Sequence, residues 1–201
     1  DSHNQAKKAA LLVKAEIEEF ESIVTIDQAM KSKSFLDDPI IVSTGDSKKA
    51  IKKAKNTLTG SLSIGGQEHY YLEGQVAISI PTEGNEMVVH SSTQNPTEVQ
   101  HLVAHVLSVP QNAIEVITRR MGGGFGGKET DSSQLACICA IFSEKTNKPV
   151  KARLSRKDDI LLTGKRHDFV ANYEVGYSDE GLIEGINLEL AARCGYSLDL
   201  S

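Results

Sequence analysis

The ten residues at positions 121–130, MGGGFGGKET, constrain the fold of this chain more than any other stretch. Five glycines surround Phe125, and glycine loses the most conformational entropy when it is ordered. Such a loop persists where the backbone needs positive φ or approaches another group closely. The β-branched residues at 113–119 predict a strand before the loop, and the apolar residues at 132–145 predict a helix after it. We interpret this strand, loop and helix as a ligand-binding unit.

Two nucleotide-binding motifs match the loop in part. The spacing of Gly122, Gly124 and Gly127 fits the dinucleotide fingerprint, in which a pyrophosphate rests on the helix N-terminus. The acidic residue expected about 20 positions later is missing, because that position falls near Lys148. The run also nearly spells a phosphate-binding loop, but Glu129 stands where Ser or Thr would hold Mg²⁺ and would repel phosphates. Both nucleotide interpretations weaken, and a glycine turn without a ligand remains an alternative.

Four motifs in chain order resemble the xanthine dehydrogenase/xanthine oxidase family. They are RMGGGFGGKET at 120–130, GQEHYYLE at 66–73, STQN at 92–95 and TGKRH at 163–167. Four collinear motifs are far more specific than one glycine loop. The similarity covers nearly the whole chain and is strongest after about residue 60. In this family the glycine loop binds a molybdenum–pyranopterin cofactor, molybdopterin, on the large chain or subunit.

The resemblance implies roles for five residues. Gln94, Gly124, Phe125 and Gly126 would bind the cofactor, and Gln94 and Phe125 would face the molybdenum through its ligands. The uncharged side-chain amide of Gln94 suits a position beside the molybdenum ligands, because it offers both hydrogen-bond donors and an acceptor. Glu129 would face the substrate. Family members that act on purines carry glutamate there and aldehyde-selective members usually carry an apolar residue, so Glu129 favours xanthine or hypoxanthine.

Structural roles compete with functional ones at several polar residues. Thr93 or Asn95 is expected to cap the following helix, which would leave Gln94 as a turn residue. On general grounds His69 is a surface or hydrogen-bonded residue. His167 is interpreted as structural, because no carboxylate or metal partner lies within sequence reach.

The implied reaction is hydroxylation of a purine with water as the oxygen source. Electrons would leave to iron–sulfur clusters and FAD on other domains or subunits of an oligomeric parent. The family's general-base glutamate and its arginine substrate motif have no counterpart in these 201 residues. The chain is therefore expected to be a fragment, inactive alone, that needs the remainder of the molybdenum domain. The alternatives are an aldehyde-oxidising or other N-heterocycle-hydroxylating member, or a non-catalytic cofactor-binding module.

The composition of the chain argues against several other classes of protein. The 22 basic and 27 acidic residues give a net charge of -5, which offers no electrostatic case for nucleic acid. The apolar runs are too short to span a bilayer and no signal-peptide pattern begins the chain, so a cytoplasmic protein is expected. Cys137, Cys139 and Cys194 lack the spacing of a disulfide framework or a metal site. We interpret them as buried thiols and expect no iron–sulfur cluster on this chain.

The expected architecture is α+β, in three parts. Residues 1–40, with a helix at 7–13 and a strand at 13–20, resemble the C-terminal tail of an α/β hammerhead domain. Residues 41–57 read as a linker, and residues 58–201 resemble the incomplete N-terminal part of a molybdenum-pterin-binding domain of mixed strands and helices. Further strands are expected at 58–64, 72–80 and 87–92, pairing antiparallel, and at 150–155, 169–177 and 182–192, with helices at 48–55, 97–107 and 156–162.

Overall fold

A computed structural model describes residues 2–200, and the chain forms two compact units, Asp1–Pro39 and Ile40–Ser201. The first unit holds two short helices, α1 (His3–Ala10) and α2 (Ile26–Ser32), joined by chain without regular structure. Each helix begins after a serine or threonine whose hydroxyl accepts a backbone hydrogen bond from the first turn. Since neither helix buries more than one residue, capping and not apolar packing defines them.

The strand predicted at residues 13–20 is absent from the first unit. These residues have no regular structure and their side chains are exposed. A strand needs a hydrogen-bonded neighbour, and the described part of this unit contains no other strand, so the prediction was wrong. The helix expected at 7–13 is found at His3–Ala10. The hammerhead assignment and the three-part division stay predictions.

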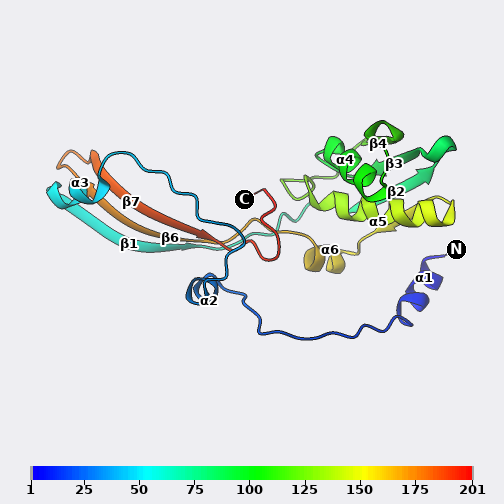
Figure 1. The fold of residues 1–201 in the computed structure, drawn as a ribbon, viewed down its shortest axis with the longest axis horizontal. Helices are drawn as coiled ribbons and strands as arrows, with labels where there is room; N and C mark the ends of the chain where they lie inside the picture. The colour runs from blue at the N-terminus through cyan, green and yellow to red at the C-terminus, as the bar shows by residue number, and fades with distance from the viewer. Residues whose placement is uncertain (1, 201) are drawn as a thin grey trace. The chain divides into compact units, whose positions relative to one another are not determined.

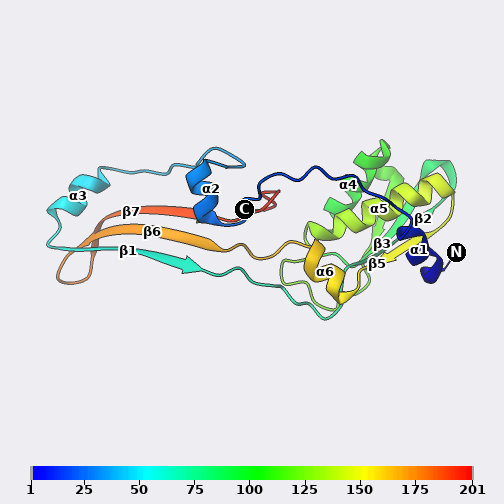
Figure 2. The ribbon, with the colours of Figure 1, turned by 90° about the horizontal axis from the view of Figure 1, so that it is seen from below.

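The second unit contains two sheets, the first of them antiparallel with the order β1-β6-β7 (Figure 1, Figure 2). Its strands are β1 (Asn56–Ile64), β6 (Phe169–Tyr177) and β7 (Ile183–Ala192). Helix α3 (Ser47–Lys53) packs on β6 and β7. A Cβ added at Gly185 would lie 2.8 Å from the Cβ of Ala50, so this glycine lets the helix lie close against the sheet.

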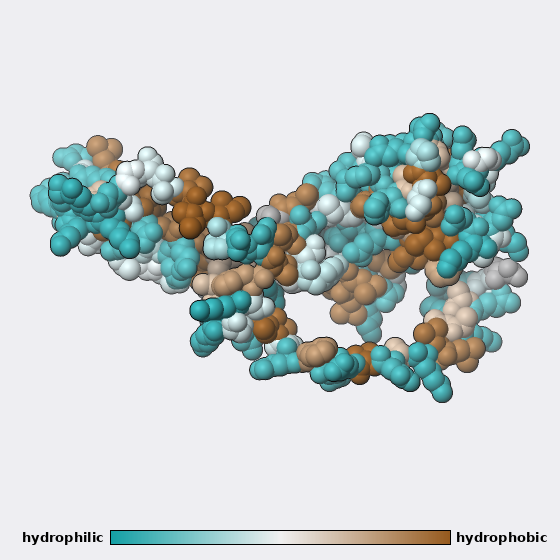
Figure 3. All heavy atoms as spheres, viewed as in Figure 1, coloured by the Kyte–Doolittle hydropathy of each residue, from teal (hydrophilic) through white to brown (hydrophobic). Residues whose placement is uncertain are grey.

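One face of this sheet is apolar. The register places Leu58 beside Val175 and Val175 beside Ile186, so these residues share a face. Leu188 and Leu190 continue that face along β7, and both are at least half exposed. Figure 3 shows hydrophobic surface in the region of this sheet. An apolar face of this kind is typical of an interaction surface.

The second sheet has the strand order β4-β3-β2-β5. The remaining elements are β2 (Val76–Pro81), η1 (Glu83–Asn85), β3 (Met87–Ser91), α4 (Pro96–Leu107), η2 (Gln111–Ala113), β4 (Ile114–Ile117), α5 (Asp131–Thr146), β5 (Val150–Arg153) and α6 (Arg156–Leu162). β2 is antiparallel to β3 and β5, whereas β3 and β4 are parallel and connect through α4. Helices α4 and α5 pack on each other and on the sheet, around a core that includes Val89, Val103 and Ala136. The glycine loop therefore joins a sheet strand to a core helix.

The expected α+β mixture of strands and helices is confirmed, and apart from shifts of one or two residues at the ends of elements the second unit shows two differences. The strand expected at 72–80 begins at Val76, because Glu73 and Gln75 bind other segments in place of a sheet partner. β2 and β3 pair antiparallel as expected. The pairing of β1 with them was wrong, because β1 lies in the other sheet beside β6.

The cysteines are only partly as expected. Cys139 is buried, whereas Cys137 and Cys194 are half-buried, because neighbouring odd positions of α5 face different ways and Cys194 lies beyond β7. Within residues 2–200, no three histidine, cysteine, aspartate or glutamate side chains lie close enough together to hold a metal ion. No helix of this described range is long and apolar enough to cross a membrane.

Candidate cofactor site

The first end of the glycine loop pairs with the segment that precedes β2. The N–H of Gly122 donates to Glu73 Oε2 at 2.9 Å, and the N–H of Glu73 donates to the Gly122 carbonyl at 3.1 Å. A Cβ added at Gly122 would lie 2.6 Å from the Cβ of Glu73. The two backbones can therefore approach this closely only because position 122 is glycine.

The second end of the loop is fixed by Lys128, whose side chain is fully buried. Its ammonium donates to Ser92 Oγ at 2.8 Å and to Glu73 Oε2 at 3.2 Å, and it lies 4.7 Å from the centre of the Tyr71 ring. Burial lowers the pKa of Lys128, and the hydrogen bond to Glu73 and the Glu73 charge oppose that shift. Burial acts to raise the pKa of Glu73, but hydrogen bonds from Gly122, Ser92 and Lys128 outweigh it and leave this pKa below its usual range.

A buried polar network supports the loop from beneath. Asp159 accepts hydrogen bonds from the Tyr71 hydroxyl and from the N–H of Gln75, each at 2.6 Å. The Gln75 side-chain amide then donates to the Gly127 carbonyl at 2.8 Å. Burial, followed by the hydrogen bond to Asp159, raises the pKa of Tyr71 to about 12, so its hydroxyl remains a donor at neutral pH. The network thus fixes a loop carbonyl through α6 and the segment before β2.

The side chain of Gln94 binds the loop directly. Its Oε1 accepts hydrogen bonds from the N–H of Gly126 at 2.9 Å and of Lys128 at 3.3 Å. Both donors require an oxygen, which fixes the orientation of the amide. Its Nε2 therefore points away from these two donors, and no acceptor for it lies within residues 2–200. Asn95 caps α4 by accepting from the N–H of Glu98, so the cap and the loop contact belong to different residues.

The tip of the loop carries backbone conformations that only glycine adopts freely. Gly123 and Gly126 have φ values of 97° and 90°. Phe125 also has positive φ, 55°, which is uncommon for a residue with a side chain, and the residue is 75% exposed. Strain of this kind clusters where a ligand is held. Within the described residues, the N–H of Phe125 has no acceptor.

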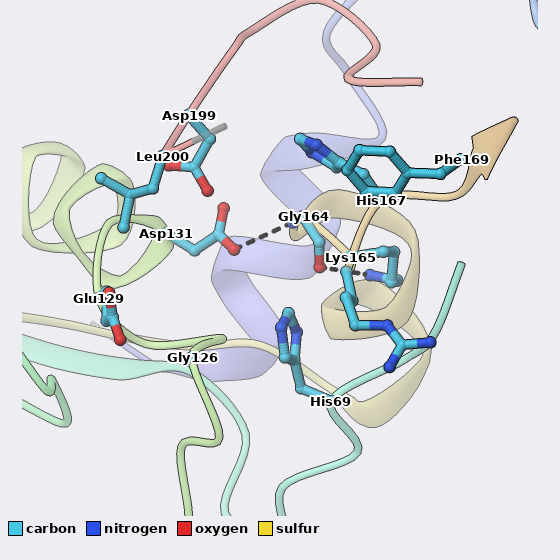
Figure 4. A pocket seen from close by; sticks show the side chains of 11 residues that line it. His69, Gly126, Glu129, Asp131, Gly164, Lys165, His167, Phe169, Asp199 and Leu200 are labelled. Carbon is cyan, nitrogen blue, oxygen red and sulfur yellow. Dashed lines mark hydrogen bonds between the residues drawn. The ribbon is translucent and has the colours of Figure 1, made fainter. Parts of the chain in front are cut away.

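Three of the four sequence motifs meet at a hollow of about 280 Å³. Figure 4 shows Glu129 and Asp131 on one side and His69 on the other, with His167 above. The Asp131 carboxylate accepts from the N–H of Gly164 at 3.0 Å. Burial raises the pKa of Asp131, and this hydrogen bond opposes the shift. No partner for the Glu129 carboxylate lies within residues 2–200, so it remains available in the hollow.

His69 packs against the loop more closely than a surface residue would. A Cβ added at Gly127 would lie 2.7 Å from its Nδ1. At Gly126 the corresponding atom would meet only the His69 Nε2, at 3.8 Å, so the space above Gly126 is open. A molybdenum–pyranopterin group fits these features, because an available amide donor, an available backbone N–H and an open glycine surface lie side by side.

Several residues of the site were missed from the sequence. Glu73 and Tyr71 belong to a quoted motif, but their partners are about 50 to 90 positions away along the chain. Asp159 follows another acidic residue at the start of a short helix, and nothing beside it in the sequence indicates a buried partner. Lys128 ends the glycine run and completes the near-match to a phosphate-binding loop, and neither pattern predicts its buried partners. The repeated glycines were the only local signal that another segment of the chain packs closely against the loop.

Two sheets and a strand–loop–helix unit with available donors at the loop tip define an α+β cofactor-binding domain. Residues 33–201 match the family model of the molybdopterin cofactor-binding domain, and the chain belongs to this family. It is 43% identical to xanthine dehydrogenase of Dictyostelium discoideum over 201 residues, which is 100% of this chain and 15% of that protein. It is also 43% identical to "Probable aldehyde oxidase gad-3" of Caenorhabditis elegans over 198 residues, 98% of this chain and 16% of that protein. The resemblance to the xanthine dehydrogenase family is therefore confirmed.

Solved structures share the fold. The aldehyde oxidoreductase of Desulfovibrio gigas aligns with a TM-score of 0.83 at 21% identity, over 96% of this chain and 22% of that chain. The quinoline 2-oxidoreductase of Pseudomonas putida 86 aligns with a TM-score of 0.79 at 19% identity, over 94% of this chain and 25% of that chain. The chain thus spans a quarter or less of the length of each of these four relatives.

Proposed function

We propose that this chain is part of the molybdenum-binding region of a longer xanthine dehydrogenase-type oxidoreductase. In this proposal the glycine loop and Gln94 hold one side of molybdopterin. The observation that carries it is the Gln94 amide, whose oxygen is bound by two loop N–H groups while its nitrogen has no acceptor within residues 2–200. The family membership of residues 33–201 supports the same assignment.

The residues of the loop would bind and orient, and the cofactor would supply the redox chemistry of hydroxylation. Gln94 Nε2 would donate a hydrogen bond to a ligand of the molybdenum. The exposed Phe125 ring would close one side of the site and exclude water. Gly126 would let the cofactor approach the backbone, and Gly124 would make room for the Gln94 side chain that binds the cofactor. Protein dipoles that are already fixed cost no reorganisation during the reaction.

The proposed substrate is a purine such as xanthine or hypoxanthine. Glu129 carries this choice, because its half-buried carboxylate faces the hollow without a partner in the described part of the chain. Leaving such a group unpaired penalises substrates that lack a matching polar edge. An aldehyde or another N-heterocycle is the second candidate, because an aldehyde oxidase is as similar to this chain as a xanthine dehydrogenase is.

The proposal also includes electron transfer to iron–sulfur clusters and FAD on other domains or subunits of an oligomeric parent. The test is to purify the full-length protein, measure molybdenum by elemental analysis, and compare turnover of xanthine, hypoxanthine and an aromatic aldehyde with an artificial electron acceptor. We expect stoichiometric molybdenum and faster turnover of the purines. Protein without molybdenum would contradict the proposed function, and turnover of the aldehyde alone would contradict the purine assignment.

A further inference from the structure

An ion pair between the fully buried Lys128 and the partly exposed Glu73 joins the two ends of the glycine loop. The ammonium of Lys128 has three N–H groups, and the structure offers three acceptors: Glu73 Oε2, Ser92 Oγ and the face of the Tyr71 ring. The same Glu73 oxygen accepts the N–H of Gly122. One carboxylate oxygen therefore contacts the first residue of the loop and the side chain that ends it.

The backbone of Lys128 connects this ion pair to Gln94. Its N–H donates to Gln94 Oε1 at 3.3 Å, and its carbonyl accepts from the Gln94 N–H at 2.8 Å. The hydroxyls of Thr93 and Ser132 donate to the same carbonyl. A displacement of Lys128 would thus move an acceptor and a donor of Gln94 at the same time, and also Glu129, which follows it.

Stability alone does not explain a lysine at this place. Replacing a buried ion pair by apolar side chains of similar volume is often neutral or stabilising, because desolvation of the charges offsets their attraction. An apolar side chain fills the same space but cannot bind three acceptors in fixed directions. The arrangement therefore favours precise placement of the loop over stability as the role of this pair.

We propose that Lys128 and Glu73 are positioning residues that fix the place of the Gln94 amide against the loop and the direction in which the Glu129 carboxylate faces the hollow. We call this pair the Lys128–Glu73 clamp. Its consequence for turnover rests on the function proposed above, whereas its effect on the loop does not. Neither residue reaches the hollow itself, since Lys128 is fully buried and Glu73 binds the first end of the loop.

The test compares Lys128→Met, the double variant Lys128→Met/Glu73→Gln and the control Lys157→Met in the full-length protein. Lys157 is an exposed lysine on α6. Amide hydrogen exchange is measured by mass spectrometry for a loop peptide, residues 119–130, and a reference peptide within α4. Molybdenum content, kcat and KM for xanthine are measured on the same preparations.

For Lys128→Met and for the double variant we expect exchange of the loop peptide to rise about tenfold while the α4 peptide keeps its protection. With molybdenum retained, kcat should fall about 10–100-fold and change more than KM, because a small misplacement of a binding group has that effect. Lys157→Met should match the wild-type protein. The double variant also removes the charge of Glu73, so it decides the outcome if the single variant does not fold.

Unchanged exchange of the loop peptide would overturn the clamp, and so would an equal rise in the loop and α4 peptides, which indicates a general structural role. Unchanged kcat in a variant with a mobile loop would overturn the positioning of Gln94 and Glu129. If the wild-type protein contains no molybdenum, the proposed function fails, but the exchange comparison still tests the clamp.

Discussion

Replacing Gly124 by alanine should displace the Gln94 amide without disturbing the backbone. The added Cβ would lie 2.4 Å from Gln94 Oε1 and 2.6 Å from its Cδ, so the end of that side chain must move. The φ of Gly124 lies outside the left-handed region, and alanine therefore introduces no backbone strain there. The expected result is local loss of the contacts that Oε1 makes with the N–H groups of Gly126 and Lys128.

The size of the effect follows from those two hydrogen bonds. Each contributes about 0.5–1.5 kcal/mol, so their loss corresponds to about 1–3 kcal/mol. If the contacts of Gln94 stabilise mainly the transition state, loss of about 1–3 kcal/mol should lower the turnover of xanthine by the full-length protein about 5- to 150-fold. The unfolding temperature should change little, because Gly-to-Ala substitution also restricts the unfolded chain.

The assay measures kcat for xanthine, molybdenum content and the thermal unfolding temperature of the Gly124→Ala protein. The matched control is Gly65→Ala, because a Cβ at Gly65 meets nothing within 4 Å and its φ is not left-handed. The control should behave as wild type. Wild-type kcat in Gly124→Ala would refute the placement of Gln94 at the reacting centre.

Three further predictions concern the hollow and the chain alone. Glu129→Val should cost purine turnover about 1–3 kcal/mol for each lost hydrogen bond and spare aldehydes, and an equal loss on both substrates in parallel assays would contradict the role of Glu129. Burial raises the pKa of Asp131, so its ionisation destabilises the fold as pH rises through the interval between its ordinary and its raised value. Asp131→Asn keeps an acceptor for the Gly164 N–H but cannot ionise. Its unfolding temperature should therefore rise relative to that of the wild type as pH increases from 3 to 7. If the difference between the two unfolding temperatures stays constant with pH, this explanation is excluded. Residues 1–201 expressed alone should self-associate and retain no molybdenum, as light scattering and elemental analysis would show, whereas a monomer with stoichiometric metal would mean that the cofactor site is complete in this chain.

Much of the second unit could be predicted from local patterns. Alternation and turn residues located β6 and α6 with their observed bounds, because each element is defined by its own residues and its immediate neighbours. The same alternation at residues 13–20 failed, since a pattern predicts a strand only where a partner strand exists. Likewise, nothing local shows that β1 pairs with β6 instead of with the strands that follow it.

The site was accessible to sequence reasoning only in part. Gln94 and the glycine loop were found through four short motifs, and the structure brings them into contact. The clamp and the network beneath it were missed, because Lys128 meets Glu73 across 55 positions and Tyr71 meets Asp159 across 88. Contacts of that separation are made by the fold and leave no periodic signal in the sequence. The roles of Gln94, Gly124, Phe125, Gly126 and Glu129 stay predictions.

The most direct test of the central claim is the distance from Gln94 Nε2 to the nearest molybdenum ligand in a crystal structure of the full-length protein. We expect a hydrogen bond of about 2.7–3.2 Å to an oxygen ligand, or a somewhat longer one to sulfur, with Oε1 still bound to the N–H of Gly126. A cofactor bound elsewhere, or a Gln94 amide nitrogen donating to another protein group, would contradict the assignment of this loop as the molybdopterin site.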